Sequence, residues 1–108
     1  MIPSWIPNGY TYKDLKILET PRVLNINAVY EKNGSELIIN IRQTIGVPAN
    51  QIEKSEDLLD VYVVDGVEYY IFSNTETLHA AWSIGEFECI ITGEITLEEM
   101  KRMIDSIK

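Results

Sequence analysis

The chain has 108 residues, of which 45% are hydrophobic, and a formal net charge of −8. This length supports a single domain, residues 1–108, with one core, and the apolar content exceeds that of disordered chains. The negative net charge argues against nucleic acid as a partner and against binding to an anionic membrane surface. No apolar run approaches the ~18 residues of a membrane span, so we expect no direct membrane insertion by this chain.

The first predicted elements are a turn and a strand. Pro7-Asn8-Gly9 predicts a tight turn, because proline fixes one backbone φ angle and glycine accepts a positive one. Residues 10–17 alternate loosely between apolar and polar side chains, which predicts a first strand, and Thr20-Pro21 interrupts the pattern.

Residues 23–44 predict a hairpin. Asn33-Gly34 suits the positive φ angles of a type I′ turn. Folding about this turn pairs apolar residues on one face and mostly polar residues on the other. The same register sets Glu31 opposite Glu36, a like-charge pair that we expect a slightly longer loop to relieve.

Residues 46–57 predict a loop, with one helical turn over residues 56–59. The loop is acidic, but its spacing lacks the Asp-x-Asp-x-Asp-Gly order of a calcium-binding loop. We therefore expect no metal site there.

Two more hairpins follow. Asp65-Gly66 predicts a turn between residues 61–64 and 67–72, and because both faces of this pair are apolar, we expect it at the centre of the sheet. Gly85-Glu86 predicts a turn between residues 78–84 and 87–92, with Trp82 and Phe87 on the face that meets the core.

After Gly93 the apolar period changes to that of a helix. Thr96 and Glu99 form a capping box, and an apolar stripe runs from Leu97 to Ile107. The sequence thus predicts the α+β class: a curved antiparallel sheet of about six to seven strands, built from hairpins, with one C-terminal amphipathic helix on one face.

Residues for catalysis are sparse in this sequence. His79 and Cys89 point to opposite faces of their predicted hairpin, so we expect no Cys-His dyad. One histidine and one cysteine do not make a zinc site, and no loop is suited to cradle phosphate. We expect no catalytic residues, no metal and no cofactor, and a protein that is not an enzyme.

Aromatic residues are the one suggestive feature. With 2 Trp and 6 Tyr, the chain has more than a core of this size can hold. Those left on a surface favour recognition of a partner. We predict a binding surface that includes Trp5, Tyr10, Tyr12 and Tyr70.

A set of short motifs resembles a bacterial extracytoplasmic family, the domain of unknown function 4367. The motifs are Pro7-Asn8-Gly9-Tyr10, Leu37-Ile38-Ile39 with Gln43, Asp65-Gly66, Leu78 to Trp82, Phe87 to Gly93, and Glu98-Glu99 to Ser106-Ile107. The resemblance implies an antiparallel sheet with a C-terminal helix. It also implies the outer part of membrane-anchored proteins of Gram-positive bacteria, including anti-sigma factor-like regulators, and carries over no catalytic residues.

Our leading hypothesis is a non-enzymatic extracytoplasmic sensing or interaction module with an unknown protein partner, located outside the membrane if it is cut from a longer protein. The alternative is a small carrier that holds an apolar ligand or lipid between sheet and helix, which requires a cavity of ~300 Å³ or more. An enzyme requires two polar groups of perturbed pKa that converge in one cleft.

Overall fold

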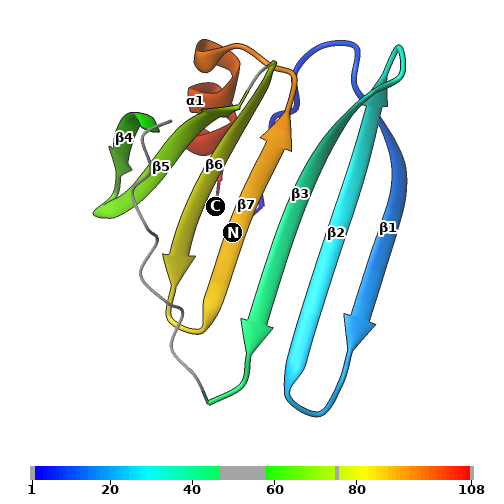
Figure 1. The fold of residues 1–108 in the computed structure, drawn as a ribbon, viewed down its shortest axis with the longest axis vertical. Helices are drawn as coiled ribbons and strands as arrows, with labels where there is room; N and C mark the ends of the chain where they lie inside the picture. Colours follow the sequence, from blue (N-terminus) through cyan, green and yellow to red (C-terminus); the bar gives the residue numbers. More distant parts are fainter. Residues whose placement is uncertain (1, 47–57, 75, 108) are drawn as a thin grey trace.

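The computed structural model describes residues 2–46, 58–74 and 76–107. Within these residues seven strands form one antiparallel sheet, and one helix follows them, which confirms the predicted α+β class (Figure 1). The elements are β1 (Thr11–Glu19), β2 (Val23–Lys32), β3 (Ser35–Thr44), β4 (Leu58–Val64), β5 (Val67–Asn74), β6 (Thr77–Ile84), β7 (Phe87–Gly93) and α1 (Leu97–Asp105).

The sheet consists of two meanders joined side by side. Its strand order is β1-β2-β3-β7-β6-β5-β4, so β3 and β7 meet in the middle and β1 and β4 form the edges. The third predicted hairpin therefore ends the sheet, and the prediction that it lies at the centre is wrong. The face of this hairpin that points away from the helix is apolar, with Val61 and Tyr70 paired across β4 and β5. It is not buried in the sheet centre, since Val63 on the same face is 57% exposed.

The two-residue turns take the predicted geometry. Asn33 and Gly34 have φ angles of 50° and 86°, and Asp65 and Gly66 have 51° and 79°. These positive values match type I′ turns, whose twist fits the flanking strands. The predicted registers follow, with Tyr30 opposite Leu37 in the β2–β3 pair.

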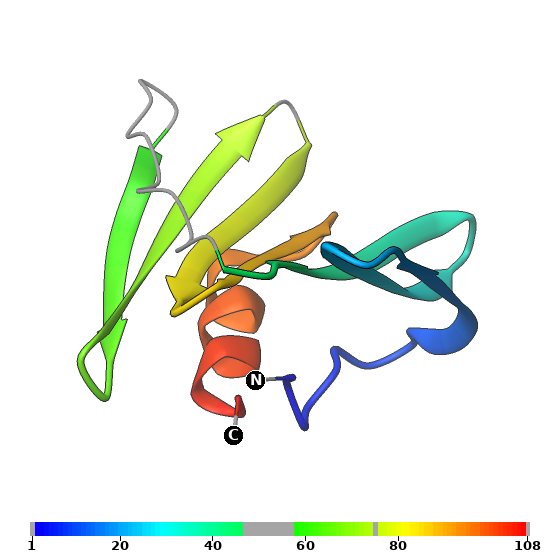
Figure 2. The ribbon, with the colours of Figure 1, turned by 90° about the horizontal axis from the view of Figure 1, so that it is seen from below.

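Helix α1 covers one face of the sheet on the β4–β7 side (Figure 2). The predicted capping box is present: the Glu99 N–H donates to Thr96 Oγ1 (3.1 Å), and the Thr96 N–H donates to Glu99 Oε1 (2.9 Å). At the other end the helix stops at Asp105, two residues before the predicted end at Ile107. Ile107 instead forms an isolated antiparallel bridge with Pro3, which ties the two ends of the chain together.

The core lies between the sheet and this helix. Trp82 of β6, Ile91 of β7, and Met100 and Met103 of α1 are all 0% exposed. The predicted contact between the helix and the sheet face of Trp82 is thus confirmed. The indole Nε1 of Trp82 is buried without a hydrogen-bond partner in the described part of the chain, while its ring lies 5.0 Å from the Tyr69 ring, centroid to centroid.

Polar contacts fasten the helix to the edge strand β4. The Tyr62 hydroxyl donates to Asp105 Oδ1 (2.7 Å), and the Lys101 ammonium pairs with Asp60 Oδ2 (2.8 Å). The Lys101 ammonium also lies 5.2 Å from the centre of the Tyr62 ring. These contacts cover the helix-facing side of β4.

The described residues test only part of the predictions for the region between β3 and β4. Residues 47–57, which hold most of the predicted loop and its acidic cluster, lie outside the described residues. Strand β4 already begins at Leu58, so the helical turn expected over residues 56–59 does not extend to that position. At the start of the chain, β1 runs to Glu19, two residues past the predicted strand end.

Candidate interaction surface on strands β1 and β2

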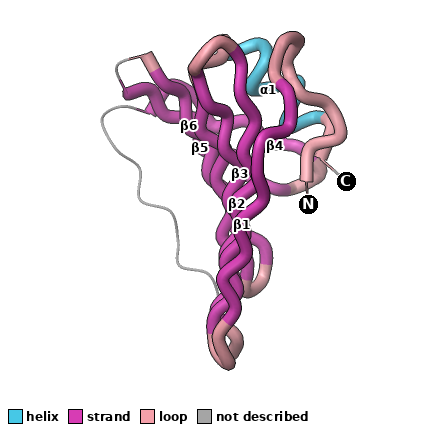
Figure 3. The backbone as a smooth tube through the Cα atoms, turned by 90° about the vertical axis from the view of Figure 1, so that its right-hand side faces the viewer, coloured by secondary structure: helices cyan, strands magenta, loops and turns pink. Residues whose placement is uncertain are grey.

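The β1 side of the sheet lies beyond the helix. Helix α1 packs on β4 and β6, and every residue of β1 is exposed. Figure 3 shows the β1–β2–β3 part of the sheet extending away from the helix and the chain ends. The helix-side face of β1 is therefore open, whereas the same face of β3 is buried in the core.

Apolar side chains occupy this open face. The register pairs Tyr12 with Tyr30, Leu15 with Ala28, and Ile17 with Ile26, and opposite residues of an antiparallel pair point to the same face. We call these six residues the β1–β2 apolar surface: Tyr12, Leu15, Ile17, Ile26, Ala28 and Tyr30.

The β1 half of this surface is the exposed half. Tyr12 is 61% exposed, Leu15 is 46% exposed and Ile17 is 59% exposed. Their partners on β2 are half-buried and pack against the edge of the core. Exposed apolar side chains that adjoin one another on a sheet can form an interaction site.

An aromatic pair forms one end of the surface. The rings of Tyr12 and Tyr30 lie 6.0 Å apart, centroid to centroid, at an interplanar angle of 71°. This edge-to-face geometry is a favoured one for aromatic rings. The contact places the exposed Tyr12 ring beside the half-buried Tyr30 ring.

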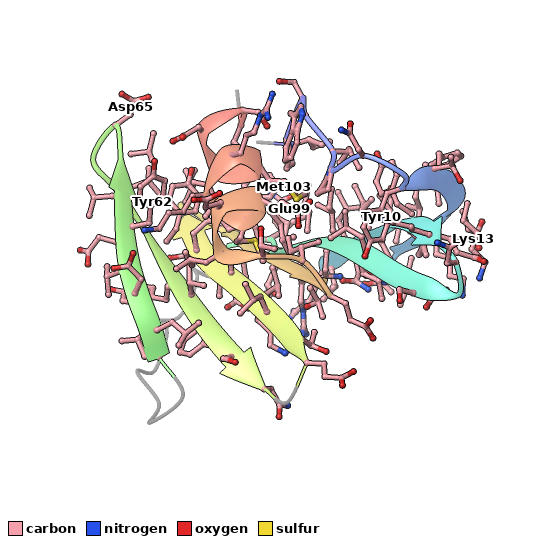
Figure 4. The ribbon with its side chains drawn as sticks, turned by 90° about the horizontal axis from the view of Figure 1, so that it is seen from above. Tyr10, Lys13, Tyr62, Asp65, Glu99 and Met103 are labelled. Carbon is pink, nitrogen blue, oxygen red and sulfur yellow. The ribbon has the colours of Figure 1, made fainter. Side chains whose placement is uncertain are left out.

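Lys13 interrupts the strand next to this pair. The β1–β2 register shifts between Tyr12 and Asp14, which places Lys13 in a bulge. Its ammonium pairs with both Glu31 Oε2 (3.0 Å) and Glu36 Oε2 (2.9 Å), and hydrogen bonds to these carboxylates raise its pKa, that to Glu36 most. The predicted relief of the Glu31–Glu36 repulsion by a longer loop is wrong, because Lys13 lies between the two carboxylates instead. Figure 4 shows Lys13 at the end of the molecule away from the helix.

The opposite face of β1, β2 and β3 is polar. It contains a shallow cavity of about 280 Å³ lined by Lys13, Asp14, Lys16, Asn27, Val29, Glu36 and Ile38. Beside it, Asn40 donates from Nδ2 to the side-chain oxygens of Asn25 (2.9 Å) and Asn27 (2.8 Å). These side-chain amides hydrogen-bond to one another across β2 and β3, so they stabilise the pairing of the two strands.

A second cavity, of about 240 Å³, lies between the start of the chain and the helix. It is lined by Trp5, Asn8, Glu98, Glu99 and Arg102. The Arg102 guanidinium stacks 4.3 Å from the centre of the Trp5 ring. This contact covers one face of the Trp5 indole, which the sequence predicts to lie on a binding surface.

The four aromatic residues predicted to form a binding surface lie in different places. Trp5 stacks with Arg102 near the helix, and Tyr10 donates to the Glu94 carbonyl (3.3 Å). Tyr70 lies on the face of the sheet away from the helix, where its hydroxyl donates to Glu68 Oε2 (3.1 Å). Of the four, only Tyr12 belongs to the β1–β2 apolar surface.

Sequence reasoning missed the aliphatic members of this surface. Leu15 and Ile17 carry the strand alternation that is also expected of buried residues, so their pattern does not distinguish an open edge from a core position. What distinguishes them is the position of β1 at the end of the sheet, beyond the helix.

The side chains considered for chemistry have ordinary surroundings. The His79 Nδ1 lies 3.0 Å from Thr92 Oγ1 on the face away from the helix, whereas Cys89 is completely buried on the other face. Burial raises the pKa of the Cys89 thiol to about 11. In the described part of the chain, no three His, Cys, Asp or Glu side chains gather as a metal site would require.

No described helix has the length and apolar character needed to cross a membrane. The only described helix, α1, has nine residues, several of them charged.

The comparisons with known proteins agree with the sequence motifs. No curated protein matches the chain. The profile of a family described as Domain of unknown function (DUF4367) matches residues 1–107. The match covers all seven strands and the helix of the described structure. The chain therefore belongs to the DUF4367 family.

Proposed function

We propose that this domain is a non-enzymatic protein-interaction module of an extracytoplasmic sensing protein, and that it contacts its partner through the β1–β2 apolar surface. The extracytoplasmic setting, as the soluble part of a membrane-anchored, anti-sigma factor-like regulator, is what the family resemblance implies. The structure supports the interaction role through one observation: a row of apolar side chains on β1 is left outside the core.

The exposure of this row is the observation that carries the proposal. Leu15 and Ile17 are paired with residues at the edge of the core, yet they remain 46% and 59% exposed. Burying the row against a partner recovers about 25 cal/mol per Å² of apolar surface. Strand β1 also offers an open edge, so a partner can add main-chain hydrogen bonds to apolar contacts.

The described residues give no support to the alternative of an apolar-ligand carrier. The side chains between sheet and helix, such as Trp82 and Met103, are 0% exposed. The cavities of about 280 Å³ and 240 Å³ lie elsewhere, on the polar face of β1–β3 and beside Trp5. The described residues therefore favour the interaction module over the carrier.

Site-specific crosslinking tests the interaction surface. A photoreactive amino acid at position 17 of the full-length native protein, in the cells that make it, is expected to give a discrete crosslinked species. The matched control is the same probe at position 63, which is similarly exposed, at 57%, on the opposite edge strand. The partner found at position 17 is then purified, and Ile17→Asp is expected to weaken its binding at least tenfold. Equal crosslinking at both positions, or none at position 17, contradicts the proposal.

The location of the domain is tested separately. On intact cells, an added protease is expected to cleave a protease site engineered into the Asn33-Gly34 turn of the full-length protein. The same site in a cytoplasmic protein serves as the negative control. Cleavage only after the cells are lysed contradicts an extracytoplasmic location.

A further inference from the structure

The outer backbone of β1 faces the open edge of the sheet at Leu15. The Leu15 N–H donates to the Asp14 carboxylate Oδ1 (2.9 Å), a side chain of its own strand, and so does not point to β2. In an antiparallel strand the N–H and C=O of one residue point to the same side. Leu15 therefore presents both groups to the open edge, where Asp14 holds the N–H. Pairing with a second strand replaces this local bond and releases the Asp14 carboxylate.

The charge of β1 differs from that of the whole chain. The chain has a formal net charge of −8, so two copies repel each other over most of their surfaces. Strand β1, by contrast, carries Lys13 and Lys16 against Asp14 and Glu19, which sum to zero. Electrostatic repulsion between two copies is thus weak where β1 of one copy meets β1 of another.

We propose that β1 pairs with β1 of a second copy of this chain, antiparallel and about a two-fold axis at Leu15. This inference rests on the proposed function, because it makes β1, which carries the exposed half of the β1–β2 apolar surface, the contact with the partner. The pairing joins two sheets edge to edge and brings the apolar surfaces of both copies onto one continuous face.

The register follows from the charges that flank Leu15. With the axis at Leu15, Asp14 of each copy lies opposite Lys16 of the other, so two ion pairs form on the polar face. With the axis at Lys16, the two Lys16 side chains oppose each other, which is unfavourable. With the axis at Ile17, Lys16 lies opposite Leu18 and neither charge is compensated.

Backbone geometry restricts the choice further. A shift by one residue sets an edge-facing residue opposite one that faces β2, so the hydrogen bonds do not match. The bulge at Lys13 ends the regular strand on one side and leaves residues 14–19 for the ladder. The ladder is short, and we expect a weak, reversible dimer rather than an obligate one.

Charge exchange tests the pairing and its register together. Sedimentation equilibrium of the whole chain over a wide concentration range is expected to show a monomer–dimer equilibrium. Asp14→Lys and Lys16→Asp, each alone, place like charges opposite each other twice per dimer, and about a tenfold rise in Kd is expected. The double variant D14K/K16D restores both pairs with reversed polarity and is expected to return Kd to near its original value. Thermal unfolding of each variant confirms that the fold is retained.

A disulfide reports the two-fold axis directly. A hydrogen-bonded antiparallel pair has a Cα–Cα distance of about 5.5 Å, within the range that a disulfide spans. Leu15→Cys is therefore expected to give covalent dimers under mild oxidation. The control is Val63→Cys on the other edge strand, and the native Cys89 does not interfere because it is 0% exposed.

The outcomes separate this inference from the proposed function. A wild-type chain that stays monomeric at all concentrations overturns self-pairing; if position 17 still crosslinks to another protein, the interaction function stands with a different partner. A dimer whose Kd is unchanged by the charge exchanges, and which Leu15→Cys does not link, overturns the β1 register. A monomer that also gives no crosslink at position 17 overturns both proposals.

Discussion

The Lys13 side chain of β1 offsets a like-charge contact near the turn of the neighbouring β2–β3 hairpin. The β2–β3 register sets Glu31 opposite Glu36, and the Lys13 ammonium reaches both carboxylates from β1. The ion pairs are exposed to solvent, so their contribution depends on ionic strength. They nevertheless connect β1 with the tip of the β2–β3 hairpin.

Replacing Lys13 is expected to destabilise the domain by an amount that salt reduces. Lys13→Ala leaves Glu31 and Glu36 opposed without a cation, so its melting temperature should fall below that of the control Lys16→Ala. In 1 M NaCl the difference should shrink, because salt screens exposed charges. The pKa of Lys13 is raised, so its contribution is present below the ordinary lysine pKa and is lost as the pH rises through the raised value. Equal losses at low and high salt would contradict this role.

Cys89 is expected to be unreactive in the folded protein. Its side chain is 0% exposed and burial raises its pKa to about 11, so little thiolate is present at neutral pH. A thiol reagent at pH 8 should modify it only at the rate of unfolding, and quickly in denaturant. Because the folded state holds the proton more tightly, stability should decline as the pH rises from about 9 toward 11. Rapid native-state labelling would show that this part of the core opens locally.

Among the elements, the helix depends most clearly on one local motif. The reciprocal bonds between Thr96 and Glu99 satisfy two backbone N–H groups at its first turn. Thr96→Ala should lower the free energy of unfolding by about 1 kcal/mol.

A double-mutant cycle separates the capping box from the effect of each side chain alone. Glu99→Ala in the Thr96→Ala background should cost less than in the original chain, because the reciprocal bond is already lost. Glu98→Ala in the same turn provides the control and should show no such coupling. Both are measured by urea unfolding, and additive losses for Thr96 and Glu99 would argue against a cooperative box.

Local motifs also explain which elements could be predicted from the sequence. Asn33-Gly34 and Asp65-Gly66 determine their own turns and thereby the registers on either side. The position of each hairpin in the sheet is not local: it depends on the pairing of β3 with β7, which no turn residue encodes. For that reason the β4–β5 hairpin was expected at the centre and lies at the edge.

At the scale of the whole molecule, the helix divides the sheet into a covered part and an open part. Amides of β5, β6 and β7 lie over a filled core, whereas β1 is exposed along its whole length. Hydrogen exchange should therefore show strong protection in β6 and β7 and the weakest protection in β1. Raising the protein concentration should protect the edge-facing Leu15 amide in particular if two copies pair. Uniform protection across the sheet would contradict this division.

The candidate surface could not be predicted because it is a product of this division. Tyr12 was predicted for its chemistry, while Leu15 and Ile17 look like core residues in the sequence. They stay outside the core because β1 forms the edge of the sheet, whereas α1 packs on β4 and β6. The same chemical argument predicts Trp5 and Tyr70 for this surface, but Trp5 lies beside Arg102 of the helix and Tyr70 lies on the opposite face of the sheet.

The central β3–β7 pair also sets how the chain reaches its native state. Ile39 and Ile91 are neighbours in the sheet although they are 52 positions apart in the sequence (91 − 39). Each meander is able to zip from its own turns, but joining them requires closure of this long loop before any β3–β7 contact repays the lost entropy. We therefore expect assembly of the two meanders along this seam to be the slow step of folding, and shortening the path between residues 44 and 58 to accelerate it.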